Sequence, residues 1–141
     1  MTNKEKLYSK FESELLVRPD DIDMNNHVHM TKYLDYLLFA RFDQMAKDYK
    51  LPMDEFLKRG YTWVATSISI DYKRSLFLGD HVIIQTQILE ISGAQVRINY
   101  WIIRKDTKKI AAEGKANFSL VSIESGKPVR IPQDILEKYT I

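Results

Sequence analysis

Apolar and polar positions follow two different periods along this chain, and the change of period separates a helical part from a β part. After Gly60, residues alternate with a period of two, which is typical of strands that turn one face toward a core. Runs rich in Ile, Val, Thr and aromatic residues predict strands at 63–73, 81–91, 94–104 and 108–123. A run with similar alternation at 7–17 predicts a first strand, which Arg18-Pro19 ends.

Between the first strand and Gly60 the spacing becomes helical. From about Met30 to Lys50, apolar residues recur every three or four positions without an intervening Gly or Pro. The segment YLDYLLFARF is apolar on more than one side, which is typical of a helix enclosed by other elements. Leu51-Pro52 ends this helix, because the residue before a proline is pushed out of the helical region. A short second helix is predicted at 52–59.

Short, turn-like segments join the strands that follow Gly60. They are Leu78-Gly79-Asp80, Ser92-Gly93 and Lys105-Asp106-Thr107-Lys108. Joins of this length predict that consecutive strands are antiparallel neighbours. Since the only long apolar helix lies between the first strand and the others, we predict an α+β fold in which a curved, five-stranded antiparallel sheet wraps around that helix.

The edges of such a sheet predict self-association. The strand that follows Gly60 is long and contains no proline that would block pairing with another chain. Pairing of two such edges across a two-fold axis would cover both of them. We therefore expect a homodimer.

Composition narrows the class of protein. The 141 residues are the size of one domain, which we expect to extend over 1–141, and they are 45% hydrophobic and 28% charged. No apolar run approaches the roughly 20 residues of a membrane-spanning helix, so no membrane association is expected. The net charge of +2 is scattered, which does not indicate nucleic-acid binding. A chain start unlike a secretory signal and the absence of cysteine fit the cytoplasm.

The stretch DIDMNNHVHMTKY, residues 21–33, gathers polar side chains just before the enclosed helix. Asp23, Asn25 and His27 occupy alternate positions there, so an extended or looping chain would direct them to one side. A helix start offers unpaired backbone N–H groups and partial positive charge, which favour an anion or a developing oxyanion. Together with a carboxylate that attacks or deprotonates water, this arrangement suits acyl transfer.

Other interpretations of the same residues stay open. Asp, Asn and Thr also cap helices and form Asx turns. His27 and His29 with Asp21 and Asp23 could ligate a metal, but no HExxH motif or second His/Cys group follows, so we expect no metal and no cofactor. The sequence also lacks GxSxG, GxGxxG and P-loop motifs, which disfavours a serine hydrolase triad and nucleotide chemistry of those kinds.

VRPDDIDMNNHVHMTKYLDYLLFAR, residues 17–41, resembles the hot-dog-fold acyl thioesterases, whose signature reads approximately VRxxDxDxxGHVNNxxYxxYxxxAR. DIDMNNHVHMTKY is especially similar to the DLDxNxHVNNxKY run of plant acyl-ACP thioesterases, and the broader pattern is that of bacterial 4-hydroxybenzoyl-CoA thioesterase-like proteins. The likeness continues at 70–80, at AAEGKANFSLVS and at 125–132, and so spans nearly the whole chain. It implies a hot-dog fold, hydrolysis of an acyl-CoA or acyl-ACP thioester in fatty acid metabolism, and a homodimer with active sites at its interface. Many members form tetramers.

The resemblance also implies catalytic roles at three positions. Asp23 falls on the catalytic carboxylate, which acts as general base or nucleophile. Asn25 and His27 match the asparagine and histidine that orient the thioester and assist the acid or base step. Tyr33 matches the family tyrosine early in the central helix.

A further set of residues is predicted to bind the substrate. It comprises Val28, His29, Met30, Tyr33, Lys73 and Arg74. The backbone N–H groups around Val28 to Met30 would polarise the thioester carbonyl. Lys73 and Arg74 are candidates for the phosphates of CoA or of a carrier protein's prosthetic arm, since ammonium and guanidinium groups bind phosphate well. A solvated turn is the alternative interpretation of these two residues.

Some positions depart from the signature. His29 and Met30 replace two asparagines, and Leu38 and Phe39 stand where many bacterial members carry a glutamate before Ala-Arg. These changes keep open a non-catalytic acyl-CoA-binding module. A hot-dog hydratase, whose motif resembles D-x-N-P-x-H, fits less well, because His27 comes one residue too soon and without the proline.

Apolar residues around the motif have two interpretations. Tyr36, Leu37 and Phe77 either line an acyl tunnel or belong to the core, and core is the commoner role of such residues.

Overall fold

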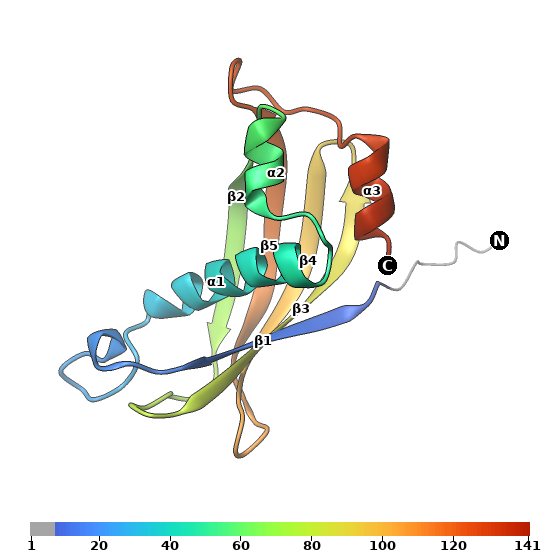
Figure 1. Cartoon of the computed structure of the whole chain (residues 1–141). Helices are drawn as coiled ribbons and strands as arrows, with labels where there is room; N and C mark the ends of the chain where they lie inside the picture. Colours follow the sequence, from blue (N-terminus) through green and yellow to red (C-terminus); the bar gives the residue numbers. More distant parts are fainter. Residues whose placement is uncertain (1–7) are drawn as a thin grey trace.

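The structure, a computed structural model, describes residues 8–141 and confirms the α+β class (Figure 1). Its strands are β1 (Lys10–Leu16), β2 (Tyr61–Tyr72), β3 (His81–Ser92), β4 (Gln95–Arg104) and β5 (Ile110–Ser122). Its helices are α1 (Lys32–Lys47), α2 (Met53–Lys58) and α3 (Gln133–Tyr139), with a 3₁₀ turn η1 at Pro19–Asp21. None of the helices in this described part is long and apolar enough to cross a membrane. Residue 7 of the predicted first strand lies outside the described residues.

The strands form one antiparallel sheet in the order β1-β3-β4-β5-β2, and α1 lies across one of its faces (Figure 1). The turns Ser92-Gly93 and 105–108 join neighbouring strands, as predicted. The prediction that β2 and β3 are neighbours is wrong, because β2 pairs with β5 instead. Leu78-Gly79-Asp80 does form a turn, in which the Asp80 N–H donates to the Phe77 carbonyl at 3.0 Å. This turn is the last part of a longer connection that runs from β2, at one edge of the sheet, to β3, next to the strand at the other edge.

One side of α1 forms the centre of the core. Tyr33, Leu37 and Ala40 are buried at helical spacing against the sheet. The predicted second apolar side is not enclosed within this chain: Leu38 is 42% exposed, Phe39 44% and Phe42 52%. One face of the helix therefore packs on the sheet, while no part of residues 8–141 covers its second apolar face.

A buried polar cluster fixes α1 against two strands. The Gln44 side-chain amide, 1% exposed, donates to the Ser13 hydroxyl on β1 at 3.1 Å and accepts from the Thr86 hydroxyl on β3. Ser13 in turn donates to Asp43 at 2.6 Å. Because buried polar groups are costly unless paired, these bonds favour a single placement of the helix over the sheet.

Helix α3 was not predicted from the sequence. It has only seven residues, too few for a helical period to be recognised, and its one signal is the preceding Pro132. Ile135 and Tyr139 are fully buried. The Tyr139 ring packs against Tyr49 at 4.6 Å and stacks on Trp63 of β2 at 6.0 Å between ring centroids, so α3 completes the core near the α1 C-terminus.

The buried tyrosines predict a sharp loss of stability at alkaline pH. Burial raises the pKa of Tyr100 and of Tyr139 from 10.0 to about 12, and raises the pKa of Tyr36 and Tyr49 further. The unfolded chain releases these protons near pH 10 while the folded chain retains them, so stability is complete below about pH 10 and falls as the pH rises above it. The part of the tyrosinate absorbance that belongs to these four buried tyrosines should appear together with the loss of circular dichroism. Ionisation of all eight tyrosines with unchanged dichroism would contradict this.

Candidate active site

The chain reverses direction just before α1. The Asp23 N–H donates to the His27 carbonyl at 2.9 Å, and the Asn26 N–H donates to the Asp23 carbonyl at 3.0 Å. Asn26 adopts a φ of 66°, a left-handed conformation that asparagine tolerates better than most residues. This tight turn places Asp23 and His27 next to each other at its base.

A cavity of about 410 Å³ opens beside this turn, between the start of α1 and the end of β2. All the predicted site residues except Asn25 line it, and Tyr72 and Ser75 line it in addition. Segments far apart in the sequence thus meet here, because β2 ends at Tyr72 next to the first turn of the helix. Tyr33, 3% exposed, packs its ring edge-on against Tyr72 at 5.2 Å and forms the floor between the two segments.

The Asp23 carboxylate is oriented by the turn itself. Its Oδ1 accepts the Asn25 backbone N–H at 2.9 Å, and its Oδ2 accepts no hydrogen bond from residues 8–141. The expectation that Asn25 shares one side with Asp23 and His27 is wrong, because the chain turns and leaves the exposed Asn25 side chain outside the cavity. Asn25 instead contributes its N–H, which holds one carboxylate oxygen and leaves the other for chemistry.

His27 approaches the cavity from the other arm of the turn. Its Nδ1 lies 3.4 Å from the Ser75 hydroxyl, and its ring packs edge-on against Phe77 at 5.2 Å. Both contacts come from the connection that follows β2. The imidazole is exposed, so it remains open to a bound molecule.

The expected oxyanion donors are only partly available. The Val28 N–H already donates to the Leu76 carbonyl at 2.9 Å, and the His29 N–H donates to the Asp21 carbonyl at 2.8 Å. These two N–H groups are therefore not free donors in the structure, since each already has a backbone acceptor. The Met30 N–H has no acceptor within the described part of the chain, and Met30 lines the cavity.

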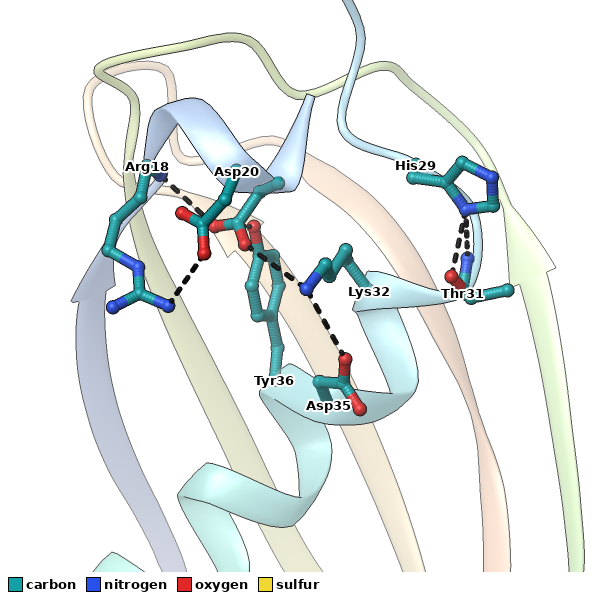
Figure 2. A network of polar contacts seen from close by, with 8 residues as sticks. Arg18, Asp20, His29, Thr31, Lys32, Asp35 and Tyr36 are labelled. Carbon is teal, nitrogen blue, oxygen red and sulfur yellow. Dashed lines mark hydrogen bonds and ion pairs between the residues drawn. The ribbon is translucent and has the colours of Figure 1, made fainter. Parts of the chain in front are cut away.

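His29 has a local role at the start of α1. Both the Thr31 N–H, at 3.2 Å, and the Thr31 hydroxyl, at 2.8 Å, contact its Nδ1 (Figure 2). Because a backbone N–H can only donate, Nδ1 is the acceptor of the bond from the Thr31 N–H. The histidine thus replaces a side-chain cap, which Thr31 itself does not provide.

Sequence reasoning missed the structural importance of Asp21. Its side chain is buried, and its Oδ2 accepts from the Arg18 N–H at 3.1 Å and from the Tyr36 hydroxyl at 2.9 Å. Lys32 approaches Oδ1 at 3.8 Å. Burial and the bond to Asp21 together raise the pKa of Tyr36. Asp21 therefore joins η1, the His29 amide and α1. Its position directly after Arg-Pro-Asp was the sequence feature that could have indicated this role.

Two cations stand at the rim of the cavity. The backbone N–H groups of Lys73 and Arg74 donate to the Ala111 carbonyl, and the Arg74 guanidinium donates to the Ile110 carbonyl at 2.9 Å. Both side chains are exposed, and neither has an ion pair within residues 8–141. Their charges are therefore available to an anionic ligand.

Other residues named from the sequence lie elsewhere. Tyr36 and Phe39 line a second cavity of about 490 Å³ between β1 and α1, so position 39 does not border the Asp23 cavity of its own chain. Leu37 is fully buried core. Phe77, 37% exposed, supports the His27 ring. Within the described residues, no group of three His, Cys, Asp or Glu side chains could hold a metal ion.

Comparison with known proteins places this geometry in context. The family model described as the thioesterase-like superfamily matches residues 17–139. The long-chain acyl-CoA thioesterase FadM of Escherichia coli is 22% identical over 130 residues, which are 90% of this chain and 95% of that protein. The DHNA-CoA thioesterase of Staphylococcus aureus superposes with a TM-score of 0.87 at 20% identity, over 93% of this chain and 89% of that one. A second S. aureus protein, solved in complex with CoA, superposes with a TM-score of 0.84 at 17% identity, over 97% and 85% of the two chains.

Proposed function

This chain belongs to the thioesterase-like superfamily, and we propose that it hydrolyses the thioester bond of an acyl-CoA to a free acid and CoA. The observation that carries the proposal is one cavity that joins the Asp23 carboxylate, the unpaired Met30 amide and two cations, Lys73 and Arg74. These are the groups that such a reaction needs: an activating carboxylate, a donor for the oxyanion and a binding site for phosphates. FadM is named an acyl-CoA thioesterase, and the second S. aureus protein was solved with CoA, so these two relatives favour CoA over an acyl carrier protein as the carrier.

The chemistry follows from the two oxygens of Asp23. Oδ2 either takes a proton from water as that water attacks the thioester carbon, or attacks this carbon itself. The carbonyl oxygen becomes an oxyanion that the Met30 N–H stabilises. The C–S bond then breaks. The leaving sulfur takes a proton from Asp23 if Asp23 has deprotonated water, and from His27, which faces the same cavity, if Asp23 itself has attacked. In the nucleophilic route, water afterwards hydrolyses the Asp23 anhydride.

Release of thiol from a panel of acyl-CoA and acyl-carrier-protein thioesters tests this function. Hydrolysis predicts stoichiometric thiol and free acid with at least one acyl-CoA. Saturable acyl-CoA binding without thiol release would contradict it and would identify a binding module. A change in enoyl-CoA absorbance without thiol release would indicate a hydratase.

The role of the rim cations predicts a change in KM rather than in kcat. Arg74→Ala should raise the KM for acyl-CoA by about 3- to 10-fold, because an exposed guanidinium–phosphate contact is worth little more than 1 kcal/mol. Acyl-pantetheine, which lacks the phosphates, provides the matched control substrate, and its KM should stay unchanged. Equal effects on both substrates would show that Arg74 acts on the fold of the cavity instead.

The exposed edge of β2 supports a homodimer. Among the strands of residues 8–141, β2 ends the sheet and pairs with β5 alone, and residues 64–67 are all exposed. Leu38 lies one helical turn before Arg41, whose guanidinium approaches Trp63 of β2, so this exposed leucine faces the same side. Edge pairing through β2 would cover this apolar surface. It would also bring the partner subunit next to the Asp23 cavity, because Tyr72 and Lys73 at the end of β2 line that cavity.

Sedimentation should therefore give a mass of at least twice the 16.6 kDa of one chain. Val64→Asp, which places a charge in the exposed part of β2, should shift the mass toward that of one chain at micromolar concentration. Leu57→Asp is the matched control, because Leu57 is similarly exposed but lies on α2. A Val64→Asp protein that keeps the wild-type mass would refute this interface.

A further inference from the structure

A cation lies inside the core without an ionic partner. Arg41 of α1 is only 6% exposed, and no hydrogen bond or ion pair joins it to any residue of 8–141. Its guanidinium carbon lies 4.2 Å from the Phe118 ring centroid and 5.9 Å from that of Trp63. A guanidinium carries five N–H donors, and aromatic faces do not satisfy them.

The surroundings of Arg41 do not neutralise it. The titratable groups that act on it are the phenols of Tyr139 and Tyr49. Phenols are uncharged at neutral pH, and burial raises the pKa of these two further. Removing a guanidinium from water costs more than a cation–π contact returns. Burial accordingly lowers the pKa of Arg41. The carboxylate of Asp48 also has a buried, unpaired oxygen, but it lies seven residues further along the helix axis, about 10 Å away.

Two further donors beside Arg41 are also unpaired. Trp63 Nε1 and Tyr139 Oη are buried and form no hydrogen bond of suitable geometry, although the indole of Trp63 lies close enough to offset part of the rise in the pKa of Tyr139. Their rings stack with 6.0 Å between centroids and 16° between planes. The three side chains come from three elements, α1, β2 and α3. Buried polar groups are normally hydrogen-bonded, so three unpaired groups together require a common explanation.

We propose that Arg41, Trp63 and Tyr139 form a binding site for a carboxylate or a similarly small oxyanion, between α1, β2 and α3. An oxyanion supplies the charge and the acceptor oxygens that guanidinium, indole and phenol donors lack. The anion has two possible sources: a small free acid, or a carboxylate at the far end of the acyl group of a substrate. The second source rests on the proposed function. Arg41 follows Tyr33 of the Asp23 cavity by eight residues on the same side of α1, about 12 Å along the helix.

Thermal unfolding in acetate tests the site without any activity. Sodium acetate replaces sodium MES, a bulky sulfonate, at constant pH and ionic strength. The wild-type Tm should rise in a saturable manner, by about 5 °C at ten times the dissociation constant. Arg41→Met, whose side chain fills similar space without charge, should show no such rise, and Tyr139→Phe should bind acetate several-fold more weakly. No acetate-specific shift in the wild type, as expected if only water fills the site, or an equal shift in Arg41→Met, would overturn the proposal. If Arg41→Met does not fold, Tyr139→Phe and Trp63→Phe decide between these outcomes.

Substrate pairs then distinguish the two sources of the anion. For acyl-CoAs of equal length that end in a carboxylate or a methyl group, kcat/KM is compared in wild type and in Arg41→Met. A carboxylate bound by Arg41 predicts a preference of about 10- to 100-fold in the wild type that Arg41→Met loses. Equal preferences in both proteins, together with a positive acetate result, assign the site to a free acid. If no acyl-CoA is hydrolysed, the proposed function fails, while the acetate result still decides whether the anion site exists.

Discussion

Asp23→Asn is expected to lower kcat/KM for thiol release by about 10²- to 10⁴-fold without changing the fold. An asparagine amide can neither attack the thioester carbon nor take a proton from water. Its carbonyl oxygen can still accept the Asn25 N–H, so the turn at 22–28 should persist. Kinetics with a thiol reagent measure the loss, and circular dichroism, Tm and sedimentation measure the fold and the assembly.

Asp71→Asn is the matched control for this experiment. Asp71 is an exposed carboxylate on β2, directly before Tyr72 of the cavity, but it does not line the cavity itself. Its replacement removes a negative charge close to the cavity and should leave the rate nearly unchanged. Full turnover in a correctly folded Asp23→Asn protein would refute the assignment.

The same residue distinguishes the two mechanisms. In a single turnover in ¹⁸O-labelled water, a general base places the label only in the released acid. A nucleophilic Asp23 takes up the label in its own carboxylate when water attacks the aspartyl carbon of the anhydride, and the released acid then carries an oxygen from the enzyme. Label in Asp23 therefore identifies the nucleophilic route. Mass spectrometry of the peptide that contains Asp23 measures the difference.

The candidate site was predictable as a set of residues because most of it is local in sequence. Residues 23–33 lie on one turn and the first turn of α1, and a motif of this length specifies which side chains come together. Asn25 and the amides of Val28 and His29 were misplaced for a physical reason. Whether a side chain points into a cavity, or an N–H is already bound, depends on the left-handed Asn26 and on acceptors such as Leu76, which lies about 50 residues later.

Long-range pairing limited the prediction of the fold in the same way. Alternation identified every strand, but the short Gly79 turn favoured a β2–β3 hairpin that does not exist. The alternation of apolar and polar residues within a strand shows which of its faces is buried, but it does not show which other strand pairs with it. Helix α3 was missed because seven residues show too little periodicity. The burial of Arg41 was also missed, because the sequence shows only that this residue lies in an apolar helix.

Asp21→Asn is expected to have the second large effect, on stability and on rate together. The substitution keeps the shape but removes the charge and turns one acceptor oxygen into a donor, which then faces the Arg18 N–H or Lys32. Loss of a charged acceptor at a buried site costs about 2–3 kcal/mol in the free energy of unfolding. Because the Asp21 carbonyl also holds the His29 amide at 2.8 Å, a shift of Asp21 displaces the segment that carries Asp23 and Met30.

A displacement of this kind should lower kcat about 10-fold or more and leave KM for acyl-CoA nearly unchanged, since Asp21 does not border the Asp23 cavity while Lys73 and Arg74 stay in place. Asp20→Asn is the control, because Asp20 lies on the same 3₁₀ turn but forms only an exposed ion pair with Arg18, and its replacement should cost less than about 0.5 kcal/mol. Tyr36→Phe removes one of the bonds to Asp21 and should give an intermediate kcat. Urea unfolding and steady-state kinetics well below the Tm measure both quantities. An Asp21→Asn protein that loses stability but keeps the wild-type kcat would show that Asp21 supports only the fold, and that the turn around Asp23 holds its catalytic geometry without it.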